Sequence, residues 1–379
     1  MGRGIRIARV FGIDISIHPS WFIILLLIVW SLGTGTFPAI YDDWSTVQYW
    51  LVAVISALLL FASVLVHELA HSLVALRQGT PVKGITLFFL GGVASIEREA
   101  TSPGREALMA GAGPLMSIVL GGSFLGLGWA ITSPEVLQAI FLYLGLINLV
   151  VAAFNLLPGF PLDGGRLLRA AIWAIRGDFV TATRDATRVA AVIAVGLMVY
   201  GGYMALTGNL IGGLWLVFIG WIVIQSSQAS YAQTLTQERL KQVPIRRVMA
   251  RLRGWVAPAA GLDETEVELA ELRARCLPVG SDPEHYDGLI CRSDISGLDD
   301  GRSSGPSHTS LTAADVMVDR EHMPTIAASD PASEAWQAMT DQKIDRLAVL
   351  DDGKLVGFID RRRLSRYLEL HPGGQRPAA

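Results

Sequence analysis

The sequence predicts a membrane α-helical bundle of about six transmembrane helices with an interfacial β-hairpin, followed by a cytosolic α/β part. Of the 379 residues, 51% are hydrophobic and only 17% are charged, a balance typical of integral membrane proteins. Apolar blocks fill the chain before Gln237, and charged residues are frequent after it. The net charge of −3, with no run of Lys and Arg among aromatic residues, argues against a nucleic-acid partner.

Six apolar blocks approach the roughly 20 residues that a spanning helix needs. They are residues 19–32, 50–76, 107–131, 136–157, 189–206 and 210–226. Cytoplasmic loops carry an excess of Lys and Arg. Basic residues precede the first block and follow the second, fourth and sixth, whereas the other connections have none. The alternation predicts a multi-pass protein of the cell membrane whose N-terminus, C-terminus and polar part are cytoplasmic.

Residues 82–97 predict the β-hairpin, because β-prone flanks surround the pair Gly91-Gly92. The segment is too short and too broken by its turn to span a bilayer. A hairpin this apolar could lie in the membrane interface and offer an edge strand to an extended peptide. The alternative is a structural loop that fills the bundle, and the sequence does not separate the two.

The second apolar block ends in a potential metal-binding motif. His67 and His71 are spaced i and i+4, so they lie on one face of a helix, and Glu68 adjoins the first of them. Residues 51–66, just before the motif, carry no charge. Ionisable groups at membrane depth cost roughly 2.5–3.5 kcal/mol each and are functional by default. The motif therefore indicates zinc-dependent hydrolysis within a bilayer.

A catalytic zinc usually has three protein ligands and an open position, so a third ligand is expected. Asp163 is the candidate, because it follows the point where Pro158 and Pro161 break the fourth apolar block. Irregular backbone at membrane depth is tolerated where it is buried or lines a water-containing cavity. The second and fourth blocks both end on the cytoplasmic side, which gives Asp163 and the histidines similar depth. The alternative is that Asp163 only caps the following helix.

The polar part contains one unit used twice, since Gly288–Ile290 recurs as Gly357–Ile359 and each copy reads helix, strand, strand. Cys276 and Cys291 lack a CxxC or disulfide-framework spacing, so we expect small core thiols in a reducing compartment. The predicted organisation is a membrane domain at 1–232, a linker at 233–243, repeats at 244–303 and 312–370 separated by a linker at 304–311, and a disordered tail at 371–379.

Several motifs together resemble the site-2 protease family of intramembrane zinc metalloproteases. They are the His67-Glu68-x-x-His71 helix, the apolar Gly-Gly hairpin, the segment Gly111–Pro114 that opens the third helix, and the pattern from Asn155 to Asp163-Gly164. The C-terminal repeats are similar to the branch of that family with a pair of cystathionine-β-synthase-type (CBS) domains. The resemblance covers nearly the whole chain.

This resemblance implies that His67, His71 and Asp163 bind one zinc ion and that Glu68 is the general base. Such a base accepts a proton from water and later delivers one to the leaving amine. The resemblance also implies that Asn155 helps to orient the substrate carbonyl or its oxyanion, as an amide donor can. The alternative for Asn155 is an interhelical hydrogen bond, which is common in membrane bundles.

Paired CBS domains often bind adenine nucleotides between the two copies, with an Asp on the ribose. Asp294 occupies that position in the first copy, whereas Arg363 stands there in the second. The resemblance thus implies one nucleotide site, and a homodimer formed through the CBS domains. The alternative is a domain that only dimerises or braces the membrane part.

The function expected from these features is intramembrane endopeptidase activity on the transmembrane segment of a substrate protein. Its expected role is regulated intramembrane proteolysis, the release of a transcription regulator from the bilayer, with nucleotide control by the CBS pair as a hypothesis. One rival is a CBS-regulated metal or ion transporter, which would need neither Glu68 beside His67 nor an open zinc position. The other rival, an inactive relative that acts as a binding protein, is disfavoured by the intact motifs.

Overall fold

The computed structural model describes residues 4–89, 91–96, 100–299, 311–342 and 344–371. The chain divides into two compact units, Met1–Ala232 and Gln233–Ala379. The predicted linker at 304–311 and the predicted tail at 371–379 lie outside the described residues, apart from residues 311 and 371. The predicted linker at 233–243 is helical as far as Lys241, because the last helix of the membrane part continues through it.

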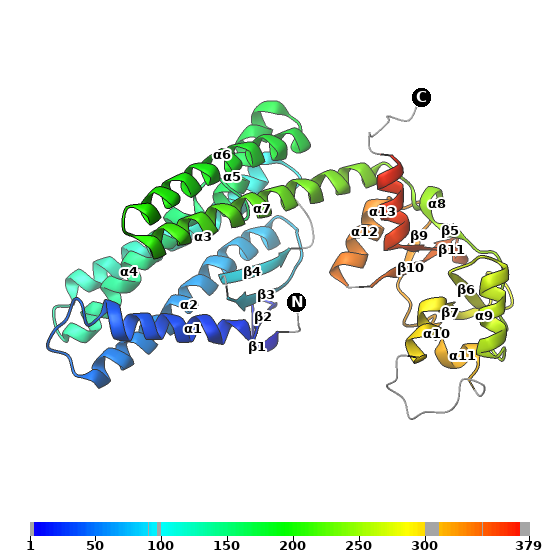
Figure 1. Ribbon diagram of the computed structural model, residues 1–379, viewed down its shortest axis with the longest axis horizontal. Coiled ribbons are helices and arrows are strands. Elements are labelled where there is room, and N and C mark those ends of the chain that lie inside the picture. The colour runs from blue at the N-terminus through cyan, green and yellow to red at the C-terminus, as the bar shows by residue number, and fades with distance from the viewer. Residues whose placement is uncertain (1–3, 90, 97–99, 300–310, 343, 372–379) are drawn as a thin grey trace. The chain divides into compact units, whose positions relative to one another are not determined.

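Five helices in the described part of the chain are long and apolar enough to cross a membrane, and they run roughly alongside one another (Figure 1). They are α2 (Thr46–Arg77), α3 (Pro103–Ala130), α4 (Glu135–Asn155), α6 (Phe179–Leu206) and α7 (Leu210–Lys241). The first predicted crossing is instead a shorter apolar helix over Ser20–Thr36, formed by α1 (Ser20–Ser31) and the π-helical turn η1 (Leu32–Thr36). At 1.5 Å per residue it is about 25 Å long. This is close to the lower limit for a spanning helix, so the structure describes five helices of full spanning length and one short apolar helix where about six crossings were expected.

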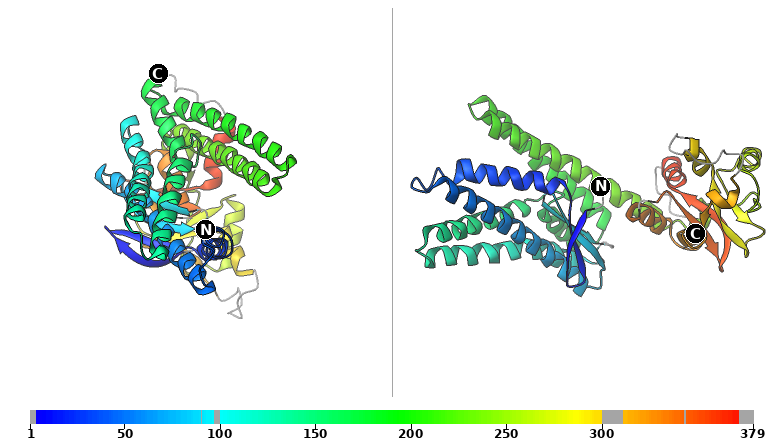
Figure 2. Two further views of the ribbon diagram at one scale, coloured as in Figure 1. Left: turned by 90° about the vertical axis from the view of Figure 1, so that its left-hand side faces the viewer. Right: turned by 90° about the horizontal axis from the view of Figure 1, so that it is seen from below.

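The predicted hairpin is present as β3 (Val82–Phe88) and β4 (Gly91–Ile96), which pair antiparallel. It belongs to a larger sheet with the order β1-β2-β3-β4, gathered at one end of the helices (Figure 2). The sequence reasoning missed β1 (Ile5–Val10) and β2 (Ile13–Ile17). Their signal was the alternation of apolar residues from Ile13 to Ile17 after a turn at Phe11-Gly12, where both residues have positive φ. β4 is an edge strand of this sheet.

The break after the fourth apolar block produces a separate helix, α5 (Asp163–Arg176). α4 ends at Asn155, and the turn between these helices contains both prolines. Asn155 and Asp163 therefore lie on different helices, although both belong to one sequence pattern. Gly177, in the left-handed conformation, ends α5, and Asp178 caps α6 by accepting a hydrogen bond from the Thr181 amide.

The second unit repeats one order of elements, helix then two strands, as the sequence predicted, and each copy adds a further helix that the sequence did not predict. In the first copy these are α9 (Leu262–Glu271), β6 (Cys276–Gly280), β7 (Tyr286–Cys291) and α10 (Arg292–Asp299). In the second they are α12 (Ala332–Asp341), β10 (Arg346–Asp351), β11 (Lys354–Asp360) and α13 (Arg361–Leu370). Shorter elements precede each set: α8 (Ile245–Val248) and β5 (Ala250–Arg251), then α11 (Ala313–Val316), β8 (Val318–Asp319) and β9 (Thr325–Ala327).

The two copies exchange their first strands, which the sequence did not predict. β5 of the first copy pairs with β11 of the second, and β8 of the second pairs with β7 of the first. The repeated glycines explain how the strands approach, since a Cβ at Gly288 would meet the Val318 carbonyl and one at Gly357 the Ala250 carbonyl. The exchange makes the two copies one interlocked body.

The expectation of two free thiols is wrong, because Cys276 and Cys291 form a disulfide. The antiparallel register of β6 and β7 places them directly opposite each other, with their Cα atoms 3.9 Å apart. Their separation of 15 residues in sequence had hidden this pairing, which only the strand register reveals.

Candidate metal and catalytic site

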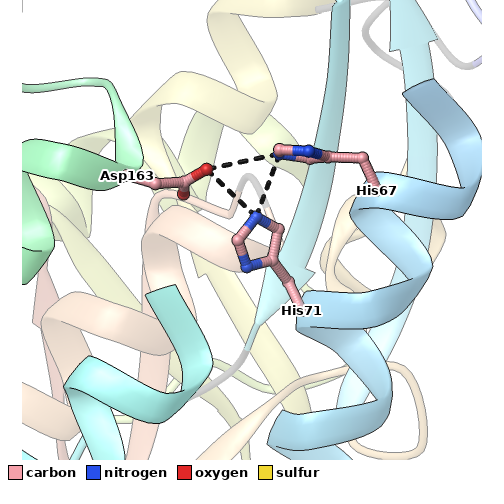
Figure 3. Close-up of side chains that lie close together, drawn as sticks. All are labelled: His67, His71 and Asp163. Carbon is pink, nitrogen blue, oxygen red and sulfur yellow. Dashed lines mark hydrogen bonds and ion pairs between the residues drawn. The ribbon is translucent and has the colours of Figure 1, made fainter. Parts of the chain in front are cut away.

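Three side chains converge where α2 meets the start of α5 (Figure 3). His67 and His71 point from one face of α2, and their Nε2 atoms lie 3.2 Å apart. Oδ2 of Asp163 is 3.3 Å from Nε2 of His67 and 3.2 Å from Nε2 of His71. Asp163 is the first residue of α5, where the helix dipole favours a negative charge. Its carboxylate does not cap the helix, so the structure contradicts the capping alternative.

Helix α3 fixes the orientation of both imidazole rings. Nδ1 of His71 lies 2.7 Å from the Met109 carbonyl oxygen, and Nδ1 of His67 lies 2.9 Å from Oγ of Ser117. A carbonyl oxygen can only accept, so Nδ1 of His71 donates and the neutral ring presents a bare Nε2. Hydrogen bonds of this kind set the tautomer of metal-binding histidines. Both rings are buried, and both turn Nε2 toward Asp163.

A glycine of α3 lets this helix pass directly against the two imidazole nitrogens. A Cβ at Gly113 would meet Nε2 of His71 and would lie 2.6 Å from Nε2 of His67. Two imidazole nitrogens and one carboxylate oxygen form a ligand set of the kind seen in catalytic zinc sites, which keep the fourth position open. The residues present therefore fit a zinc ion.

Glu68 lies between the histidine pair and the sheet. A Cβ at Gly92 would be 2.5 Å from Cγ of Glu68 and 3.3 Å from its Oε1, so the backbone of β4 passes directly against this side chain. Glu68 is only half-buried, unlike the two histidines. Its carboxylate is therefore placed to reach water between the metal-binding residues and the edge strand.

Asn155 is not connected to this cluster. Its Nδ2 donates to the Val151 carbonyl in its own helix at 3.0 Å. Hydrogen bonds among the described residues do not link it to Glu68 or Asp163, nor do they carry the interhelical contact that was the alternative. The role expected of it, orienting the substrate carbonyl, has no contact in the structure to support it.

The sequence reasoning missed the contribution of α3. Met109, Gly113 and Ser117 follow at intervals of four, so they lie on one face of this helix. The small-residue segment around Gly113 had been noticed only as part of a resemblance. The spacing was visible, but the identity of the facing helix required the tertiary structure.

Asp294, the expected ribose contact, is engaged within the protein. Its carboxylate accepts from the Cys291 amide at 3.0 Å and pairs with the Arg346 guanidinium of the second copy at 2.5 Å. Arg363 donates to the Val248 carbonyl at 3.0 Å and so closes the end of α8. Each of these two motif positions thus makes a contact between the copies.

Comparison with known proteins identifies both parts of the chain. The model of peptidase family M50 matches residues 55–134 and 130–200, and the CBS domain model matches residues 313–370. A protein of Synechocystis named "Putative zinc metalloprotease sll0528" is 34% identical over 97% of this chain and 96% of its own length. "Putative zinc metalloprotease Rip3" of Mycobacterium tuberculosis is 30% identical over 98% of this chain and 94% of its own.

A solved structure, the site-2 protease from Methanocaldococcus jannaschii, is 27% identical and covers 60% of this chain and 94% of that chain, with a TM-score of 0.39. The full-length relatives carry the assignment, because their similarity extends through both units. The chain thus belongs to peptidase family M50, the site-2 proteases, and is a zinc-dependent metalloendopeptidase of the membrane with a C-terminal CBS domain.

Proposed function

We propose that this enzyme cleaves transmembrane segments of substrate proteins inside the bilayer, with His67, His71 and Asp163 as zinc ligands. The observation that carries the proposal is the convergence of these three groups beside Gly113. The histidines belong to α2, a helix apolar enough to span a membrane, so hydrolysis at this site takes place at membrane depth. The substrate class follows from that position.

The residues divide the chemistry between them. When bound, zinc lowers the pKa of a coordinated water to about 7 and polarises the peptide carbonyl. Glu68 accepts the proton that water loses as its oxygen adds to the carbonyl carbon. Glu68 then delivers that proton to the amide nitrogen as the C–N bond breaks, which leaves a carboxylic acid and an amine. The α3 contacts hold both imidazole rings still throughout the cycle.

The substrate is proposed to bind as an extended peptide along the edge of β4. A transmembrane helix must unwind before a protease can reach its backbone, and a sheet edge offers hydrogen bonds to an unwound strand. The contact between Gly92 and Glu68 would bring such a strand beside the general base. Site-specific photo-crosslinking from position 94 of an inactive Glu68→Gln variant should capture the substrate. Capture from position 6 on β1, with none from position 94, would contradict this binding mode.

The decisive experiment on the activity is Glu68→Gln in the purified full-length enzyme. Cleavage of a reporter transmembrane helix should fall by about 10²–10⁴-fold, the usual contribution of a general base, while bound zinc is retained. Asp163→Asn should lose both zinc and cleavage. A Glu68→Gln enzyme that still cleaves would remove Glu68 from the mechanism, and a transporter would keep its transport in that variant.

The biological role proposed is the release of a membrane-tethered transcription regulator into the cytoplasm. The alternation of basic connections supports a cytoplasmic site and cytoplasmic termini. The Cys276–Cys291 disulfide points the other way, since disulfides are rare in a reducing cytosol. Labelling of a single added cysteine after residue 371 in intact cells decides the orientation, because a membrane-impermeant reagent should not reach it.

Regulation by an adenine nucleotide and dimerisation at the CBS pair remain part of the proposal. The ion pair between Asp294 and Arg346 sets a condition on nucleotide binding, because a ribose could reach the carboxylate only if Arg346 moved away. Calorimetry of the full-length protein with ATP, ADP and AMP tests this directly. Binding that is unchanged in Asp294→Asn would place the nucleotide elsewhere, and light scattering measures the oligomeric state in the same samples.

A further inference from the structure

A buried ion pair outside the proposed ligand set joins α3 to α5. Glu106 on α3 is fully buried and Arg169 on α5 is 6% exposed. Nε of Arg169 donates to Oε1 of Glu106 at 2.8 Å, and its Nη2 contacts the same oxygen. Arg166, one turn earlier on α5, has its Nε 3.9 Å from that oxygen. The other carboxylate oxygen, Oε2, has no hydrogen-bond partner within the described residues.

An ion pair buried in this way contributes little to the stability of the fold. Removing two charges from water is costly, and an apolar pair of similar volume is often equally stable or more stable. A buried pair with directed hydrogen bonds does, however, fix how two elements lie against each other. Among the described residues, the two arginines that face Glu106 both come from α5, so the compensation of its charge depends on the position of that helix.

The two helices joined by this pair must keep a fixed relative position for a metal to bind. Glu106 is one turn before Met109, whose carbonyl orients His71, and α3 also carries the Ser117 contact to His67. Arg169 lies on the helix that begins with Asp163. The pair therefore ties the helix that orients the histidines to the helix that carries the carboxylate.

Arg169 also contacts the segments that precede and follow α5. Its guanidinium carbon lies 5.2 Å from the centre of the Phe160 ring, in the turn before α5, and 4.6 Å from that of Phe179, at the start of α6. Cation–π contacts of this kind are strongest where water is excluded. One side chain thus restrains the turn that leads into Asp163, the helix itself and the helix that follows.

We propose that Glu106 and Arg169 are positioning residues that hold Asp163 at ligating distance from His67 and His71. A functional group must stay within about 0.5 Å of its productive position, so a small shift of α5 relative to α3 would be enough to weaken metal binding. Partners of metal ligands typically change metal affinity by about 10–100-fold, and we expect a change of that size here. The inference rests on the proposed ligand set.

The test is the zinc dissociation constant of the purified full-length protein, measured by competition with a fluorescent chelator. The informative variant is the double change Glu106→Leu with Arg169→Met, which removes both buried charges together and leaves neither unpaired. We expect zinc to bind about 10–100-fold more weakly, while the melting temperature of the metal-free protein is unchanged or raised. A purely structural pair would instead lower the melting temperature and leave the dissociation constant of the folded protein unchanged.

Two further variants keep the result interpretable. Arg169→Lys retains the charge but loses the two-nitrogen contact, so it should give an intermediate loss of affinity even if the double variant does not fold. Arg176→Gln is the matched control, because its pair with Asp185, at 3.3 Å, lies at the exposed end of the same helix. Wild-type zinc affinity in Arg169→Lys or in the folded double variant would overturn the inference. An Asp163→Asn protein with wild-type affinity would instead overturn the ligand set.

Discussion

Two aspartates predicted as binding residues have opposite surroundings. Asp163, in the membrane unit, faces the Nε2 atoms of two histidines, beside a glycine of α3. Asp294, in the CBS unit, is already paired with Arg346. A carboxylate that converges with two imidazole nitrogens is suited to a metal cation. A carboxylate that holds a guanidinium already has its cation, so its motif alone does not make it a ligand site.

Gly113→Ala should be the most disruptive change around Asp163. The added Cβ would occupy the space beside both Nε2 atoms, so we expect zinc affinity to fall by more than about 100-fold, beyond the range typical of outer contacts. Overpacking beside two buried rings typically costs about 1–3 kcal/mol, of which the higher helix preference of alanine offsets about 0.5–1 kcal/mol, so the metal-free protein should be only moderately destabilised. Zinc content by mass spectrometry and metal-free thermal unfolding measure both effects.

Gly111→Ala is the matched control on the same helix. Its Cβ would lie 3.8 Å from Cδ2 of Leu167, an ordinary contact, and should leave zinc affinity unchanged. Equal zinc affinity in Gly113→Ala and Gly111→Ala would show that the metal does not bind beside Gly113.

Gly92→Ala tests the role of the general base independently of metal binding. Its Cβ would displace the Glu68 side chain without approaching the histidines, so kcat should fall at least about 10-fold while zinc is retained. Cleavage of a reporter helix and zinc content, measured on one preparation, provide the two readouts. Loss of zinc together with activity would mean that β4 supports the metal site itself rather than the base.

The sequence predicted the features that depend on residues close together along the chain, and it missed those that depend on distant residues. The i and i+4 spacing of His67 and His71 is local, and the proline-broken segment limited where Asp163 could lie. The partners of these residues on α3 and α5 are more than thirty positions away, and no local periodicity identifies which helix faces which. The disulfide and the exchanged strands of the CBS unit were missed for the same reason, because both depend on register between strands.

A smaller loss of zinc affinity is expected from Ser117→Ala. Removing the hydroxyl frees one ring nitrogen of His67, and losing such a partner typically weakens metal binding by about 10–100-fold. Ser63→Ala is a matched control, because this buried serine donates only to the Leu59 carbonyl of its own helix. Chelator competition on both variants should show a difference, and equal affinities would remove Ser117 from the support of the site.

The smallest effect should come from Arg346→Gln in the CBS unit. The pair with Asp294 is mostly buried, with side chains 22% and 17% accessible, so its loss should cost about 1–3 kcal/mol of stability. Chemical denaturation measures that cost, and Arg246→Gln, which breaks a more exposed pair with Asp351, is the control. The variant also frees the Asp294 carboxylate. If Arg346 is what blocks a nucleotide, Arg346→Gln should bind ATP more tightly than wild type, whereas weaker binding would make the arginine part of the nucleotide site.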